Sequence, residues 1–219
     1  MKWPKAPDSF ESASGGTARR VATVLRLYAL LENTGFRSLA TRLYRVELHG
    51  AERIPASGPA ILVANHESLF DPWILALVTP RPIRYMAKSE LWQHRIIGAV
   101  MESFGAFPVE RGTGDAAAMS RAAQLLRDGH ALGLFPQGTS KLRAPRRYHR
   151  GAARLALATG APLLPVGLRG TRGTPWPWLH RRTQIIVGEP IEVEPSRPTM
   201  AAARALTSEL ELRIERATT

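Results

Sequence analysis

A histidine and an aspartate lie five residues apart in the segment NHESLFD (65–71), which directly follows the apolar run AILVAN at 60–65. On an ideal helix the two side chains would be about 140° apart and would not meet. They meet if residues 66–71 form a tight turn before a helix, and Pro72 favours this because proline is common in the first helical turn, with Asp71 left as the N-cap. A carboxylate beside an imidazole fixes its tautomer and stabilises its protonated form. His66 and Asp71 therefore suit a general base acting on a hydroxyl or an amine, whereas the purely structural alternative is a helix cap and a loop histidine.

Other catalytic schemes have weaker support in the sequence. Ser68 lacks the G-x-S-x-G elbow of a serine hydrolase, and His66, Glu67 and Asp71 lack the H-E-x-x-H spacing of a metal site. The chain has no cysteine, which excludes disulfides, thiolate catalysis and iron–sulfur clusters. No P-loop or dinucleotide fingerprint is present, so NAD and ATP sites lack support. Together with the missing metal-site spacing, this leads us to expect neither a metal nor a bound cofactor.

Two further polar loops follow apolar runs. GAFPVERG (105–112) places Arg111 at the end of a run, where its planar fork of donors suits a phosphate; the alternative is a surface arginine paired with Glu110 or Asp115. FPQGTSK (135–141) supplies an amide, a glycine, two hydroxyls and a cation, namely Gln137, Gly138, Thr139, Ser140 and Lys141. Both loops are compatible with an anionic ligand.

The elements that position these loops alternate between strands and helices. Apolar runs predict strands at 45–48, 60–65, 83–87, 106–110, 131–135, 162–168, 183–188 and 191–193. Helical patterns cover 72–79, 89–104, 115–128, 150–159 and 199–217. This order predicts an α/β fold with a mostly parallel central sheet flanked by helices, in which ligands bind at the carboxyl ends of the strands.

The N-terminal region differs from the rest of the chain. Residues 1–16 form a polar stretch that we expect to be a mobile tail, and 17–44 read as two basic amphipathic helices before an α/β domain at 45–219. Such helices lie on an anionic membrane or cover the core as ordinary surface helices. The longest stretch without a formal charge runs only from Leu155 to Leu168, so we expect no transmembrane helix, and the first residues have no signal-peptide core.

The charge of the chain predicts a polyanionic partner. Lysine and arginine number 30 against 18 acidic residues, a net charge of +12, and KLRAPRRYHR (141–150) concentrates part of it. Nucleic acid, anionic lipid and an acidic protein all fit, and so does a simple solvated basic surface. The sequence has no helix-turn-helix or RNA-binding signature, so we expect no nucleic-acid partner.

Four segments together resemble the glycerolipid acyltransferase family, which includes the 1-acylglycerol-3-phosphate (lysophosphatidic acid) acyltransferases. NHESLFD, GAFPVERG, FPQGTSK and APLLPVGL (161–168) are similar to its four sequence blocks and occur in the same order. Lys88 in AKSEL and RGAARLA at 150–156 also fit the family pattern. The resemblance implies a glycerol-3-phosphate acyltransferase-like fold and membrane-docking helices at the N-terminus.

The resemblance also implies a reaction. His66, oriented by Asp71, would deprotonate an acceptor hydroxyl that attacks the thioester of acyl-CoA or acyl carrier protein, which serves as co-substrate, while an apolar groove takes the acyl chain. Acceptor and donor would be bound by residues that match the family's blocks: Asn65, Lys88, Arg111, Gln137, Gly138, Thr139, Ser140 and Lys141. The expected location is cytoplasmic and peripheral, at the inner face of the cell membrane.

Two positions depart from the family pattern F-P-E-G-T-R-S. Gln137 stands where glutamate is usual and Ser140 where arginine is usual. Either Lys141 or Arg143 replaces the missing cation, or the acceptor is a non-phosphate hydroxyl or amine. A third hypothesis, from another class, is a non-catalytic basic module that binds anionic lipid or nucleic acid.

Overall fold

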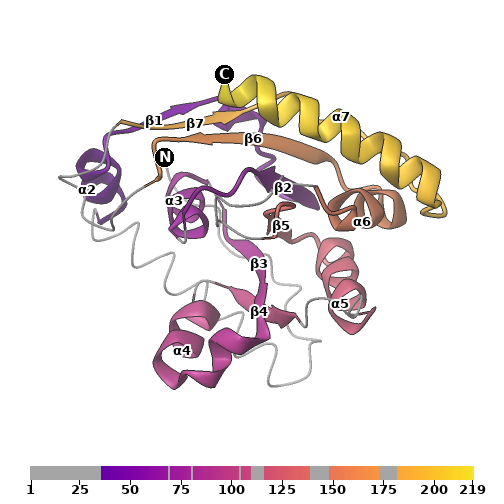
Figure 1. The fold of residues 1–219 in the computed structure, drawn as a ribbon, viewed down its shortest axis with the longest axis horizontal. Helices are drawn as coiled ribbons and strands as arrows, with labels where there is room; N and C mark the ends of the chain where they lie inside the picture. Colours follow the sequence, from indigo (N-terminus) through magenta and orange to yellow (C-terminus); the bar gives the residue numbers. More distant parts are fainter. Residues whose placement is uncertain are drawn as a thin grey trace.

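A seven-stranded sheet forms the centre of the computed structural model, which describes residues 36–68, 70–79, 81–103, 105–109, 116–138, 148–172 and 182–219 (Figure 1). The strand order is β1-β7-β6-β2-β5-β3-β4. The strands are β1 (Val46–His49), β2 (Ala60–Ala64), β3 (Ile83–Lys88), β4 (Ala106–Val109), β5 (Ala131–Leu134), β6 (Leu163–Arg169) and β7 (Thr183–Val187). The α-helices are α2 (Phe36–Leu43), α3 (Asp71–Val78), α4 (Arg95–Ser103), α5 (Ala116–Arg127), α6 (Gly151–Thr159) and α7 (Met200–Thr218), and the short 3₁₀ helices are η2 (Ala51–Arg53) and η3 (Ser89–Gln93).

The sheet is mostly parallel, which confirms the fold class expected from the sequence. Among the described strands, every neighbouring pair is parallel except β6 and β7. The four central strands β6, β2, β5 and β3 therefore end at one edge of the sheet. Loops after these strands meet at that edge, which we call the carboxyl edge.

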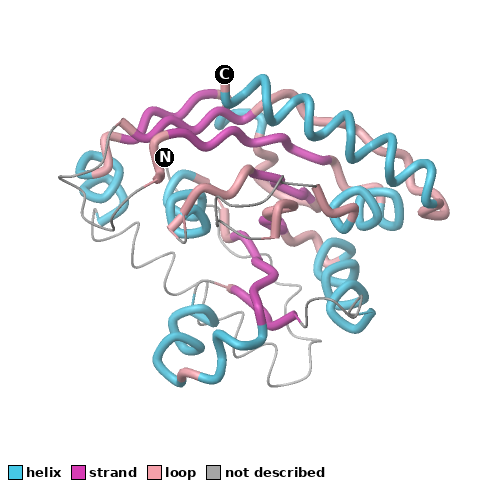
Figure 2. Tube along the Cα trace, viewed as in Figure 1, coloured by secondary structure: helices cyan, strands magenta, loops and turns pink. Residues whose placement is uncertain are grey.

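Both faces of the sheet are covered by helices (Figure 2). All five residues of β2 are buried, and their side chains alternate between the faces. Leu62 and Ala64 belong to a cluster with residues of α2 and α3, whereas Ile61 and Val63 belong to a second cluster with residues of α5, α6 and α7. Gly167 lets α7 approach β6 closely, because a Cβ there would lie 2.5 Å from the carbonyl oxygen of Ala217.

Two sequence expectations about the elements are wrong. The helix expected at 89–104 is broken at His94, which is extended, into η3 and α4. The break lets η3 fold back on α4, where Gly98 packs on Trp92 and the Trp92 indole donates to Glu102. The strand expected at 191–193 is a single bridge in which Ile191 exchanges two backbone hydrogen bonds with Leu163. Pro190 and Pro195 flank it, and prolines remove the N–H donors that a longer ladder needs.

The N-terminal expectations are only partly covered by the described residues. α2 corresponds to the second of the two basic amphipathic helices expected over 17–44. The first helix and the tail at 1–16 lie outside the described residues.

Candidate active site

Two loops lie side by side at the carboxyl edge of β2 and β5. These strands are parallel neighbours with Val63 opposite Leu134, so the chain leaves both at the same level. The loop after β2, residues 65–71, holds the predicted base and is called the catalytic loop below. Its His66 backbone N–H donates to Oε1 of Gln137 in the loop after β5, at 2.7 Å.

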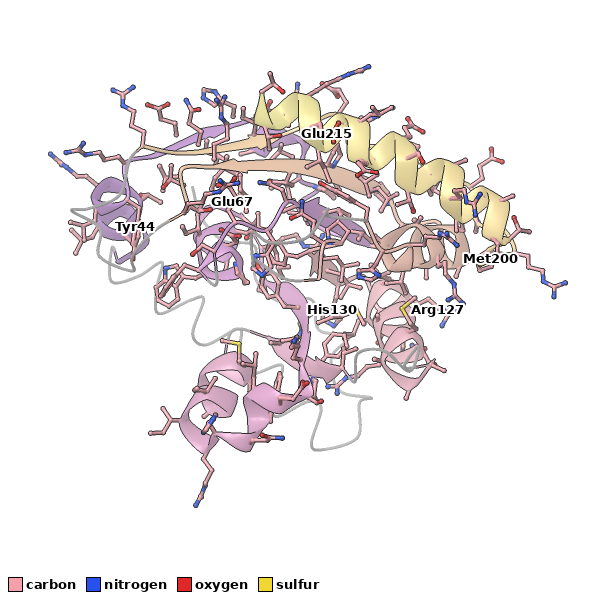
Figure 3. The ribbon with its side chains drawn as sticks, viewed as in Figure 1. Tyr44, Glu67, Arg127, His130, Met200 and Glu215 are labelled. Atoms are coloured by element: carbon pink, nitrogen blue, oxygen red, sulfur yellow. The ribbon has the colours of Figure 1, made fainter. Side chains whose placement is uncertain are left out.

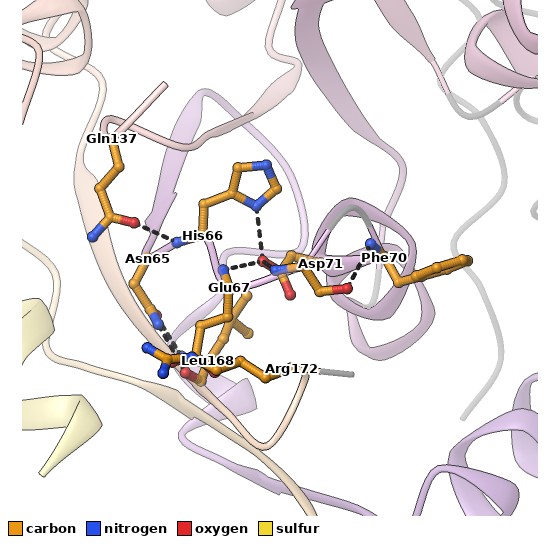
Figure 4. A network of polar contacts seen from close by, with 9 residues as sticks. Asn65, His66, Glu67, Phe70, Asp71, Gln137, Leu168 and Arg172 are labelled. Atoms are coloured by element: carbon orange, nitrogen blue, oxygen red, sulfur yellow. Dashed lines mark hydrogen bonds and ion pairs between the residues drawn. The ribbon is translucent and has the colours of Figure 1, made fainter. Parts of the chain in front are cut away.

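His66 and Asp71 meet across a tight turn. Nδ1 of His66 lies 2.8 Å from Oδ2 of Asp71, although the residues are five apart in the chain (Figure 4). The turn is closed by two backbone donors, the N–H groups of Glu67 and Ser68, at 2.6 and 2.8 Å from the same carboxylate oxygen. Three donors therefore converge on Oδ2, and the expected turn geometry is confirmed.

Asp71 is not the N-cap of the following helix. Phe70 occupies that position, and Asp71 is the first residue of α3 with Pro72 after it. Its carboxylate points back to residues 66–68, because the converging donors lie there. The side chain is fully buried, and its second oxygen, Oδ1, has no hydrogen-bond partner among the described residues.

This contact assigns different tasks to the two nitrogens of the His66 imidazole. With Nδ1–H donating to the carboxylate, Nε2 carries the lone pair that accepts a proton. Figure 4 shows Nε2 on the side of the ring away from Asp71. The ring is also held by Phe135, whose ring centroid lies 4.5 Å away, and the His66 side chain is only 12% exposed. The imidazole is thus fixed in one orientation before any substrate binds.

Asn65 anchors the start of the catalytic loop. Its side-chain amide donates to the Leu168 carbonyl at 2.8 Å and accepts from the Leu168 N–H at 2.7 Å. The amide thus continues the pairing of β2 with β6 beyond the end of β2. Asn65 is buried, and the contacts that the structure gives it position the catalytic loop.

The other predicted binding residues divide into described and undescribed positions. Lys88 is exposed at the end of β3, two strands away from β2 at the carboxyl edge. Gly138 has a φ of 69°, a left-handed conformation that favours glycine, and its N–H donates to the Phe135 carbonyl. The remaining four, Arg111, Thr139, Ser140 and Lys141, lie outside the described residues.

Two residues that contact the site were not among its predicted residues. Arg172 lies beyond the end of β6, with its Nε 3.4 Å from Oε1 of Glu67, the residue after His66. Its sequence signals were its place after the fourth apolar block and among the basic residues that follow KLRAPRRYHR. Phe135 was quoted as part of FPQGTSK, but a phenylalanine at a strand end gave no sign that it would contact the imidazole.

A metal site and a separate cavity are two other kinds of candidate site. Among the residues that the structure describes, no three His, Asp or Glu side chains are grouped to hold a metal ion. An open cavity of about 470 Å³ lies between α7, β6 and β7, lined in part by Pro165, Ile186 and Leu212. It contains none of the predicted site residues, so it is not the acyl groove next to His66 that the family resemblance implies.

A buried basic cluster lies at the opposite edge of the sheet, where the central strands begin. Arg81 donates to the carbonyls of Pro55, Gly58 and Gly129 and so joins the loops before β2 and β5. Burial, followed by the nearby charge of Arg84, lowers the pKa of His130 to about 4. Figure 3 shows His130, which is partly buried, away from the catalytic loop at Glu67. We assign this cluster a structural role.

Comparisons with known proteins give a matching family model and similar sequences. The model of the family described as Acyltransferase matches residues 45–169. The chain is 30% identical over 176 residues to the 1-acyl-sn-glycerol-3-phosphate acyltransferase of Bacillus subtilis, covering 78% of this chain and 86% of that protein. It is 29% identical over 157 residues to the chloroplastic 1-acyl-sn-glycerol-3-phosphate acyltransferase LPAT1 of Arabidopsis thaliana, covering 68% of this chain but only 44% of that longer protein.

A solved structure has the same fold. The 1-acyl-sn-glycerophosphate acyltransferase PlsC of Thermotoga maritima superposes with a TM-score of 0.60 and 19% identity, covering 91% of this chain and 95% of that one. This likeness confirms the α/β architecture with its mostly parallel sheet.

Proposed function

The chain belongs to the acyltransferase family, and from this premise we propose that it transfers a fatty acyl group from a thioester to the free hydroxyl of lysophosphatidate or a related glycerolipid. The donor is acyl-CoA or acyl carrier protein. The observation that supports the mechanism best is the 2.8 Å contact between His66 Nδ1 and the buried Asp71 carboxylate, which leaves Nε2 as the proton-accepting nitrogen. The relatives named 1-acyl-sn-glycerol-3-phosphate acyltransferase support the acceptor class.

The reaction follows from this arrangement. The acceptor hydroxyl gives its proton to Nε2 of His66 while its oxygen bonds to the thioester carbonyl carbon. The tetrahedral intermediate collapses, the carbon–sulfur bond breaks, and the proton passes from the imidazolium to the leaving thiolate. Asp71 stabilises the imidazolium that exists between these steps. A positioned base of this kind contributes about 10²–10⁴-fold in rate.

Stabilisation of the oxyanion falls to cationic and polar groups at the carboxyl edge. Lys88, at the end of β3, and Arg172, beyond the end of β6, are cations at this edge among the described residues. By the family resemblance, Thr139 and Ser140 would supply further donors, and Arg111 and Lys141 would hold the acceptor phosphate. All four lie outside the described residues.

The two departures from the family pattern have different consequences. The Gln137 side chain acts as an acceptor for the His66 N–H, and an amide oxygen serves this contact as well as a carboxylate oxygen does. The change from glutamate to glutamine is therefore compatible with an intact catalytic loop. The change to Ser140 removes a cation from the block, and it favours a second candidate function in which the acceptor is a non-phosphate hydroxyl or amine.

The location belongs to the same proposal. None of the helices among the described residues has the length and apolar content needed to cross a bilayer. We place the enzyme at an anionic membrane surface, on the cytoplasmic face, where its lipid substrates are found. No bound cofactor takes part in the reaction as written.

The acceptor is tested by measuring thiol release from acyl-CoA and from acyl carrier protein with a panel of acceptors. The proposal predicts release and formation of a diacyl product with lysophosphatidate, and little with a lysolipid that lacks the phosphomonoester. Turnover of the thioester with other acceptors but not with lysophosphatidate would favour the second candidate. Absence of thiol release with every acceptor would favour the non-catalytic module.

A further inference from the structure

Helix α4 presents large apolar side chains to solvent at its first turn. Ile96 is 81% exposed and Ile97 is 41% exposed. The opposite side of the helix is the one that packs, because Gly98 lies against Trp92 of η3 and Glu102 accepts a hydrogen bond from the Trp92 indole. The isoleucines therefore lie on a part of α4 that its own packing leaves uncovered. A surface helix normally places polar residues there.

The position of this turn relative to the site comes from the sheet register. Lys88 ends β3 at the carboxyl edge, and η3 begins at the next residue and leads into Arg95. The first turn of α4 thus follows closely on the edge at which the catalytic loop lies. It is on the β3–β4 side of that loop, whereas α2 precedes β1 at the other end of the sheet.

Helix α2 has a matching character. Leu39 and Leu43, one turn apart, are 56% and 50% exposed. They lie on one face of the helix, close to Arg42. In Figure 1, α2 lies beside α3, which begins with Asp71, and α4 lies below α3. Exposed apolar side chains therefore occur on helices at both ends of the sheet, one following β3 and the other preceding β1.

Charge identifies the kind of partner. The apolar residues on both helices alternate with basic ones: exposed His94 and Arg95 precede Ile96, and Arg42 and Arg45 accompany Leu43. Aliphatic side chains flanked by arginines fit an anionic lipid surface, in which the chains enter the acyl boundary and the guanidinium groups stay among the phosphates. The net charge of +12 has the sign that such a surface attracts.

We propose that the first turn of α4 is a second lipid-contacting element that inserts Ile96 and Ile97 into an anionic bilayer and turns the catalytic loop toward it. This inference rests on the proposed function, because a lipid acceptor must reach His66 from the membrane. If the N-terminal helices alone docked the protein, α4 would contribute nothing to membrane affinity. The proposal assigns part of that affinity to α4.

The experiment measures partition of the full chain onto sonicated vesicles of phosphatidylglycerol and phosphatidylcholine in equal parts. Ile96→Gln should lower the partition coefficient by about tenfold. Glutamine lacks most of the transfer free energy that an exposed isoleucine gains when it enters the bilayer. Arg95→Gln should lower it by about fivefold on these vesicles and leave it unchanged on pure phosphatidylcholine. Met200→Gln is the matched control, since Met200 is 63% exposed at the far end of α7, away from α2 and Tyr44 (Figure 3).

Partition of Ile96→Gln equal to that of the Met200→Gln control would overturn the proposal. So would a loss of self-association by Ile96→Gln in light scattering with vesicle binding unchanged, since the surface would then bind a second copy of the chain. Circular dichroism verifies that the variants fold. Thiol release by the unaltered protein is measured separately without vesicles, so that failure of lipid contact and failure of acyl transfer are distinguished.

Discussion

Replacing Gln137 tests whether the loop after β5 positions His66, the proposed general base. The Gln137 Oε1 accepts the His66 backbone N–H at 2.7 Å in a partly buried place. Gln137→Leu keeps a similar side-chain size but removes the acceptor. A buried donor left without its partner costs about 1–3 kcal/mol.

That cost acts on the conformation of the catalytic loop that directs Nε2 toward substrate. Other conformations of the loop, in which the His66 N–H finds another partner, do not carry this cost. The fraction of molecules with the loop in the active conformation then falls by about 5- to 150-fold, and kcat falls with it. The KM for the acyl donor should change little, because the substitution adds no group to the site. Gln137→Glu restores an acceptor oxygen and should recover most of the activity.

The assay is thiol release at saturating acyl donor, together with urea unfolding of each variant. We expect Gln137→Leu to lose activity while its cooperative unfolding is preserved. Wild-type kcat in Gln137→Leu would refute the positioning role. Equal damage by Gln137→Glu and Gln137→Leu would also refute it, because one variant retains the acceptor and the other does not.

Three further predictions concern the contacts around the sheet. Asp71→Asn keeps the side-chain volume but cannot stabilise an imidazolium, so kcat should fall by about 10²–10⁴-fold with a folded protein, as stopped-flow thiol release would show. Asn65→Ala removes both hydrogen bonds to Leu168 and should lower the free energy of unfolding by about 2–4 kcal/mol in urea titrations. The pKa of His130 is lowered from 6.5 to about 4 in the folded chain. As the pH falls, the unfolded chain therefore binds a proton at this histidine before the folded chain does. About 3 kcal/mol of stability that is present above pH 6.5 should be lost by pH 4. His130→Gln should flatten this pH dependence of unfolding, and an unchanged slope would contradict the assignment.

The strands and the local turn were predictable because their signals are local. β-branched and leucine runs bounded by Gly and Pro located β2, β5 and β6 to within a residue or two. Pro72 marked the start of α3 and indicated that the catalytic loop is a turn. The N-cap was misplaced by one residue, since sequence shows a carboxylate near a helix start but not the direction in which it points.

The remaining contacts depend on strand order, which local pattern does not contain. Asn65 and Leu168 are 103 residues apart and meet only because β2 lies beside β6. The pairing of Gln137 with His66 likewise requires β5 to lie on the other side of β2. The break at His94 arises because Trp92 packs back on Gly98, a tertiary contact that the helical pattern of 89–104 conceals.

The most direct test of the general-base mechanism is the rate constant of thiol release by His66→Ala beside that of His49→Ala. His49 is an exposed histidine at the end of β1 and serves as the control. The mechanism predicts that His66→Ala loses about 10²–10⁴-fold in rate while remaining folded, and that His49→Ala keeps the wild-type rate. A His66→Ala protein that transfers acyl groups at the rate of the control would contradict the assignment of His66 as the base.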